Sequence, residues 1–185
     1  MPMKLFRFTM VGSAALLMVL CTTSCNKEGC TNKNALNYDS EAIKDDGSCE
    51  LEYIADDQTF ANWSSWTQGA QHTGADPSLG GAHGGNDSSA VRTVYWKESQ
   101  TPVDGIYPLG TVIIKQTELS DGSTVLTGMV KRGDNYDASG GDWEYFMLNS
   151  DGTIADDGAA RGSDLMNGMC KSCHAFADTD FIFTD

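Results

Sequence analysis

The segment Cys170-Lys171-Ser172-Cys173-His174 constrains this chain more than any other feature. Two thiols separated by two residues lie on one helical turn, where both can add to the vinyl groups of haem. The histidine that follows presents an imidazole to the iron from the same side. The motif therefore predicts one covalent haem c, attached through Cys170 and Cys173, with His174 as the iron ligand.

Other chemistries for this segment need more than the sequence supplies. A Cys170–Cys173 disulfide and a zinc half-site are the structural alternatives. Zinc needs further ligands, and the only other histidines are His72 and His83. A thioredoxin-like site normally follows an N-terminal βαβ unit, which the pattern lacks.

The position of the motif narrows the type of haem site. Eleven residues follow His174, and none is methionine or histidine. A sixth protein ligand must then come from upstream; the candidates are Met129, Met147, His72, His83 or a lysine. The simplest interpretation is an open distal position that binds small ligands, while electron transfer alone would need one of these ligands.

The first residues read as an export signal. Lys4 and Arg7 precede a short apolar run, residues 11–20, which is too short to span a bilayer. The Thr-Thr-Ser sequence before Cys25 resembles a bacterial lipobox, which predicts a signal peptide over residues 1–24 and a lipidated Cys25. Cys21 is the alternative cleavage site, but it follows large residues where small ones are needed.

Charge restricts the partners. The net charge is −14, and removal of residues 1–24 leaves 10 Lys and Arg against 26 Asp and Glu, or −16. Such a chain repels nucleic acid and anionic lipid, so we expect membrane contact only through the acyl anchor. The chain is expected to be exported and to face the periplasm or the cell surface, where a basic redox partner is compatible with its charge.

Residues 25–52 form a separate N-terminal unit. The segment from Cys30 to Cys49 has little apolar content and cannot fold by burial alone, so a Cys30–Cys49 disulfide is expected. It resembles short disulfide modules of bacterial cell-surface proteins. Its oxygen-bearing side chains are either calcium ligands or a solvated acidic surface; they are Asn34, Asn37, Asp39, Asp45 and Asp46.

Residues 53–185 form the main domain, for which the pattern predicts an α+β, mainly β fold. Four segments rich in β-branched and aromatic residues predict an antiparallel sheet; they are residues 91–96, 111–117, 124–131 and 142–148. Residues 58–66 place aromatic side chains on one helical face, residues 68–90 read as a long loop, and Ser163 is the expected N-cap of a helix that runs into Cys170.

Residues 58–185 resemble the cytochrome P460 family, whose relatives include the cytochromes c′-beta. The matching segments are Arg92-Thr93-Val94-Tyr95, Tyr107-Pro108-Leu109-Gly110-Thr111-Val112-Ile113-Ile114-Lys115, Gly141-Asp142-Trp143-Glu144-Tyr145, the haem motif, and Asp180-Phe181-Ile182-Phe183. The resemblance implies a β-sheet domain, often dimeric, with haem packed against the sheet and an exchangeable distal site. It also implies binding of nitric oxide or carbon monoxide, or oxidation of hydroxylamine.

The resemblance implies a role for Lys115, because P460 proper links the matching lysine covalently to the haem. The strand pattern alone makes Lys115 an exposed lysine on the more polar face. Arg92 is a candidate ligand of a haem propionate, or a member of a cross-strand salt bridge. His83 lines the haem pocket or lies in a solvated loop.

Hydroxylamine oxidation also needs a base near the distal ligand. Glu144, Asp142 and Asp164 are the candidate carboxylates, and each reads equally well as a surface residue. Four aromatic side chains are candidates to cap the distal face, or simply core residues; they are Phe60, Trp63, Trp66 and Phe146.

Overall fold

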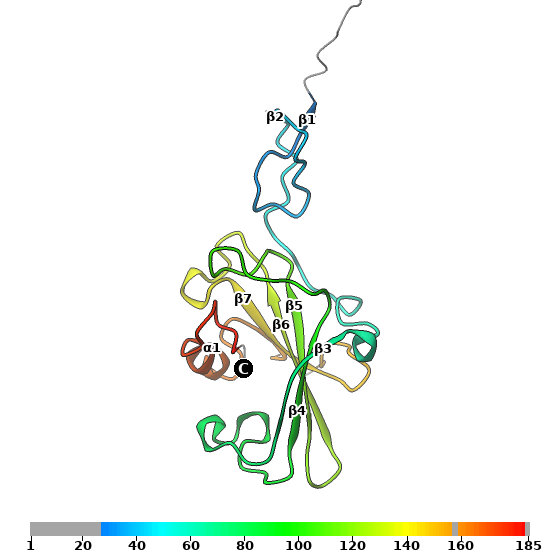
Figure 1. Cartoon of the computed structure of the whole chain (residues 1–185), viewed down its shortest axis with the longest axis vertical. Helices are drawn as coiled ribbons and strands as arrows, with labels where there is room; N and C mark the ends of the chain where they lie inside the picture. The colour runs from blue at the N-terminus through cyan, green and yellow to red at the C-terminus, as the bar shows by residue number, and fades with distance from the viewer. Residues whose placement is uncertain (1–26, 157–158, 184–185) are drawn as a thin grey trace, which may run out of the picture.

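The chain forms a small N-terminal module that extends from one end of a larger sheet domain (Figure 1). The fold is that of a computed structural model, which describes residues 27–156 and 159–183. The predicted signal peptide, residues 1–24, and the predicted lipidation site Cys25 lie outside the described residues. Within the described part of the chain, no helix is long and apolar enough to cross a membrane.

The N-terminal module is closed by the predicted disulfide. Cys30 and Cys49 are bonded, and β1 (Glu28–Gly29) pairs in parallel with β2 (Lys44–Asp45). Four of the five side chains considered for calcium already bond within the module; they are Asn37, Asp39, Asp45 and Asp46. These contacts favour the solvated acidic surface, and calcium stays an untested prediction for this segment.

The main domain is built on one six-stranded sheet in which neighbouring strands along the chain pair antiparallel. This confirms the predicted α+β, mainly β fold. The strands are β3 (Thr67–Thr73), β4 (Val91–Trp96), β5 (Val112–Glu118), β6 (Thr124–Lys131), β7 (Trp143–Leu148) and β8 (Arg161–Gly162). The four predicted strands are β4 to β7.

Three local predictions were wrong. Residues 67–73 form an edge strand rather than a loop, with a register shift between Gln68 and Gln71. Residues 58–66 form turns and one 3-10 helix, Trp63–Ser65, rather than a longer helix. The C-terminal helix α1 (Met169–His174) begins after Gly168, so Ser163 is not its N-cap. A left-handed φ of 76° at Gly168, which suits glycine, sets the start of this short helix.

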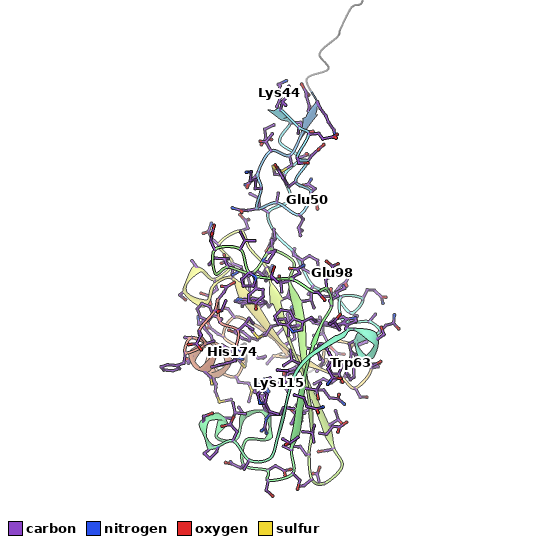
Figure 2. All side chains as sticks on the ribbon, in the orientation of Figure 1. Lys44, Glu50, Trp63, Glu98, Lys115 and His174 are labelled. Carbon is purple, nitrogen blue, oxygen red and sulfur yellow. A yellow bond between two sulfur atoms is a disulfide. The ribbon has the colours of Figure 1, made fainter. Side chains whose placement is uncertain are left out.

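Strand alternation divides the core into two clusters, one on each face of the sheet. Phe60 and Phe146 pack together on one face, with Trp63 and Trp66 against the same cluster. These aromatic residues are therefore core residues on the face opposite the haem motif, and they do not cap the distal face of a haem. The opposite face carries α1; its cluster comprises Tyr107, Ile113, Met129, Trp143, Tyr145, Leu165 and Ile182. Figure 2 shows Trp63 and His174 on opposite sides of the sheet.

Candidate haem site

The helix α1 carries both cysteines of the motif as free, partly buried thiols. The Cys170–Cys173 disulfide considered above is not formed. Burial raises the pKa of the Cys170 thiol. No group of three or more His, Cys, Asp and Glu side chains within residues 27–156 and 159–183 is arranged to hold a metal ion, so the zinc alternative gains no further ligands.

His174 is oriented with one ring nitrogen engaged. Its Nδ1 lies 2.7 Å from the carbonyl oxygen of Phe181. Because a carbonyl only accepts, Nδ1 carries the proton and donates it, which leaves Nε2 with its lone pair as a metal ligand. Burial lowers the pKa of His174 to about 4, so the ring is neutral at neutral pH. This arrangement is that of a histidine prepared to bind a metal.

Aromatic rings flank this imidazole. The ring centroids of Tyr145 and Phe183 lie 5.4 Å and 5.5 Å from that of His174. Tyr145 belongs to β7 and Phe183 to the segment after α1, so the sheet and the chain end together hold the ring in place. Such a fixed orientation limits the direction from which Nε2 can bind iron.

Lys115 faces the same side of the sheet as α1. It pairs with Val94 on β4 and Thr127 on β6, in the central part of the sheet (Figure 2). The strand pattern predicted an exposed Lys115, and this prediction was wrong, because Lys115 is partly buried. Burial lowers its pKa, and the positive charge of Arg92 lowers it further, against the opposing effect of Cys173. The amine is therefore closer to its neutral, nucleophilic form than an ordinary lysine.

His83 is the third nitrogen group of this site, and its partial burial favours the pocket-lining alternative over a solvated loop histidine. It lies in the 3-10 turn Ala82–Gly84 with a left-handed φ of 47°. Burial lowers its pKa to about 3, and the charges of Lys115, His174 and Arg92 act in the same direction. A neutral imidazole of this kind can accept a hydrogen bond.

Arg92 on β4 is hydrogen-bonded to the loop that carries His83. Its residue is 4% exposed, and its guanidinium donates to the carbonyl oxygens of Gly74 and Gly84 at 2.6 Å and 3.5 Å. These loop carbonyls, rather than a carboxylate across the strands, are its hydrogen-bond partners. Arg92 therefore positions His83, and its contact with a haem propionate stays a prediction.

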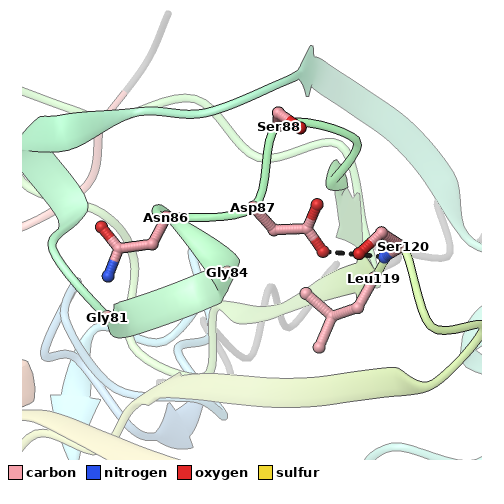
Figure 3. A pocket seen from close by; sticks show the side chains of 7 residues that line it. All are labelled: Gly81, Gly84, Asn86, Asp87, Ser88, Leu119 and Ser120. Atoms are coloured by element: carbon pink, nitrogen blue, oxygen red, sulfur yellow. Dashed lines mark hydrogen bonds between the residues drawn. The ribbon is translucent and has the colours of Figure 1, made fainter.

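A second anchor holds the other side of this loop. Asp87 accepts hydrogen bonds from the backbone N–H groups of Ser89 and Ser120 at 2.8 Å and 2.7 Å. Figure 3 shows the contact with Ser120 and the hollow that lies there; its lining residues are Gly81, Gly84, Asn86, Asp87, Ser88, Leu119 and Ser120. Asp87 is the only ionisable residue that lines this hollow, and its carboxylate is already hydrogen-bonded. The contacts here therefore fix the loop in place and do not indicate a ligand site.

The candidate carboxylates have other partners. Glu144 lies on the face opposite α1, with a side chain 2% exposed, and its oxygens pair with Arg161 at 2.7 Å and Arg132 at 3.4 Å. Asp142 accepts a bond from the N–H of Asp137, and Asp164 is an exposed partner of Lys171. Glu144 is therefore separated from His174 by the sheet, and it is a buried ion-pair residue rather than a surface one.

Two buried hydroxyls on the α1 face have no hydrogen-bond partner in the described structure. They are the Oη of Tyr145 and the Oγ1 of Thr117. Burial raises the pKa of Tyr145, so its hydroxyl stays protonated. A buried unpaired hydroxyl costs about 1–3 kcal/mol, so these donors fit a bound group with polar atoms on this face. Tyr145 entered the sequence-based predictions only within a segment that resembles the P460 family, and Thr117 was not named there, because both resemble ordinary strand residues.

The residues present therefore fit a haem c group. The two thiols would attach the group, Nε2 of His174 would bind its iron, and two unpaired hydroxyls share the same face. Met129 and Met147, considered above as sixth ligands, pack on this face in its apolar cluster. Comparison of the chain with family models, curated proteins and solved structures finds no match.

Proposed function

We propose that this chain is a mono-haem c-type cytochrome of the P460 type, which binds nitric oxide or a similar small molecule at an open distal position. The observation that carries the proposal is the state of His174. One ring nitrogen is engaged by the Phe181 carbonyl, and the other has no hydrogen bond within residues 27–156 and 159–183, on a helix that also presents two free thiols.

The surroundings of His174 support a ligand-binding site. Bound haem would supply the iron that takes the ligand. Lys115 and His83 lie within electrostatic range of His174, and burial disfavours the charged form of each. Neutral nitrogen groups suit an uncharged ligand such as nitric oxide better than an anion. The proposed cytochrome is exported and anchored through Cys25, with homodimers expected from the family resemblance.

The test uses the full chain, expressed with a cytochrome c maturation system. A denaturing gel stained for haem must stay coloured, and a Cys170→Ala, Cys173→Ala variant must lose the colour. The ferrous spectrum should be high-spin and should change on addition of nitric oxide. Loss of haem colour from the wild-type protein refutes the haem site, and a low-spin spectrum indifferent to nitric oxide points to electron transfer.

A second candidate is an enzyme that oxidises hydroxylamine or a related nitrogen compound. The observation that favours it is the partly buried Lys115, whose lowered pKa makes the amine available for a covalent link to the haem. A peptide mass that joins Lys115 to haem, together with a strongly red-shifted Soret band, would support this activity. In that case Lys115, whose amine is shifted toward its neutral form, is the candidate proton acceptor, since Glu144 lies on the other face of the sheet.

A further inference from the structure

The turn that follows α1 has an unusual backbone. The N–H of Ile182 donates to the carbonyl of Thr179 at 2.8 Å, which closes a tight turn. Its two central residues, Asp180 and Phe181, have φ values of 44° and 65°. Positive φ at two successive residues is normally the territory of glycine, asparagine or aspartate, and phenylalanine is unusual there. Such a turn persists only where its surroundings hold it.

Asp180 provides these restraints. Both of its carboxylate oxygens lie 2.8 Å from Nζ of Lys131, and one accepts the backbone N–H of Tyr107 at 2.8 Å. Its backbone carbonyl accepts the indole N–H of Trp143 at 2.8 Å. The Asp180 and Lys131 side chains are 2% and 9% exposed, so the ion pair is almost fully buried.

The next residue touches the proposed iron ligand. The carbonyl of Phe181, which immediately follows Asp180, is the one that accepts the Nδ1 proton of His174. The direction of that carbonyl depends on the turn, and the turn is fixed by Asp180. A continuous set of bonds therefore runs from Lys131 on the sheet to the ring of His174.

We propose that Asp180, held by Lys131, is a positioning residue for His174 that sets how strongly the imidazole donates to iron. This inference rests on the proposed haem function. A hydrogen bond from Nδ1–H to a carbonyl fixes the tautomer and raises the basicity of the ligating nitrogen. A more basic ligand favours ferric over ferrous iron, so loss of the turn raises the reduction potential.

The experiment compares Asp180→Ala with Asp137→Ala in the haem-loaded full chain. Asp137 also pairs with a lysine, Lys171 of α1 at 2.8 Å, and within the described residues it has no hydrogen bond or ion pair with the turn at residues 179–182. Both variants lose one negative charge, so their difference isolates the effect of the turn. The readouts are the iron–histidine stretching frequency of the ferrous protein and the midpoint potential.

Asp180→Ala is expected to lower the stretching frequency and to shift the ferric–ferrous equilibrium about tenfold toward ferrous iron, which is about 59 mV for one electron. The Asp137→Ala variant should retain the wild-type frequency. If Asp180→Ala does not fold, Asp180→Asn, which retains an acceptor for the Tyr107 N–H, should give a smaller shift in the same direction.

The two proposals fail in different ways. Absence of covalent haem in the wild-type chain refutes the proposed function. Covalent haem with the same stretching frequency and potential in the Asp180 and Asp137 variants refutes the positioning role alone.

Discussion

Acidification should destabilise this protein through one histidine, His83. Its pKa falls from the ordinary value of 6.5 to about 3 in the folded chain, with burial as the largest cause. The unfolded chain therefore binds a proton at this residue below pH 6.5, whereas the folded chain resists protonation until about pH 3. Stability is retained above pH 6.5 and is lost as the pH falls from that value toward 3.

The size of the effect follows from the two pKa values. At pH 5 the unfolded state is stabilised at this residue by about 2 kcal/mol relative to pH 8, because one pKa unit corresponds to about 1.4 kcal/mol. A His83→Gln variant has no such proton to bind. The difference in unfolding free energy between wild type and His83→Gln should therefore change by about 2 kcal/mol between pH 8 and pH 5.

The assay is urea unfolding at both pH values, monitored by tryptophan fluorescence. The matched control is His72→Gln, an exposed histidine on the neighbouring edge strand β3. A wild-type minus His83→Gln difference that is the same at pH 5 and pH 8 would show that His83 titrates as a solvated residue. The same result would contradict the burial of His83 beside Lys115 and Arg92.

Three further predictions test other parts of the structure. Glu144→Gln should lower the free energy of unfolding in urea by about 3 kcal/mol, because it breaks a buried ion pair. The control is the exposed Glu118→Gln, which should change this free energy by less than about 0.5 kcal/mol. Equal effects of the two substitutions would contradict the buried pairing of Glu144 with Arg161 and Arg132. The double variant Cys30→Ser, Cys49→Ser loses the disulfide, whose cysteines are separated by 19 residues in sequence, and the N-terminal module should be destabilised by about 3 kcal/mol. Proteolysis of residues 27–52 should accelerate, while the unfolding of the sheet domain is unchanged. Lys115→Met should be more stable than wild type at pH 7. The reason is that the folded amine has a lowered pKa, so the wild-type protein loses stability as the pH falls below 10.5. An unchanged unfolding midpoint and an unchanged ferrous spectrum would place Lys115 in solvent.

The sheet was largely predictable from the sequence because four of its strands carry strong β-forming residues between clear turns. Strand β4 matches the predicted residues 91–96, and β6 matches residues 124–131. Strand β3 was missed because its sequence, Thr-Gln-Gly-Ala-Gln-His-Thr, has almost no apolar content. An edge strand can form from such residues since its backbone bonds to β4 while its side chains face solvent.

The surroundings of the motif were less predictable, because they depend on segments distant in sequence. Nothing local distinguishes His83 from a solvated loop histidine; it is enclosed because Arg92 and Asp87 bind its loop to the sheet. A sequence motif cannot predict the contact between the Phe181 carbonyl and His174, since every residue has a backbone carbonyl. Its role depends on the backbone of the turn and on the buried pair that Asp180 forms with Lys131.

The alternation of β7 decides which chemistry the site can support. Tyr145 and Glu144 are neighbours in sequence, yet Tyr145 packs against His174 while Glu144 is held by arginines on the opposite face. The α1 face therefore gains an aromatic hydroxyl from this strand and no carboxylate. Of the two nitrogen groups on this face, Lys115 is shifted toward its proton-accepting neutral form, whereas His83 resists protonation until about pH 3 and is suited to accept a hydrogen bond. A His83→Gln variant that binds nitric oxide normally but loses hydroxylamine oxidation would assign to His83 the hydrogen bond that orients this substrate, and equal activity of both proteins would exclude it from that step.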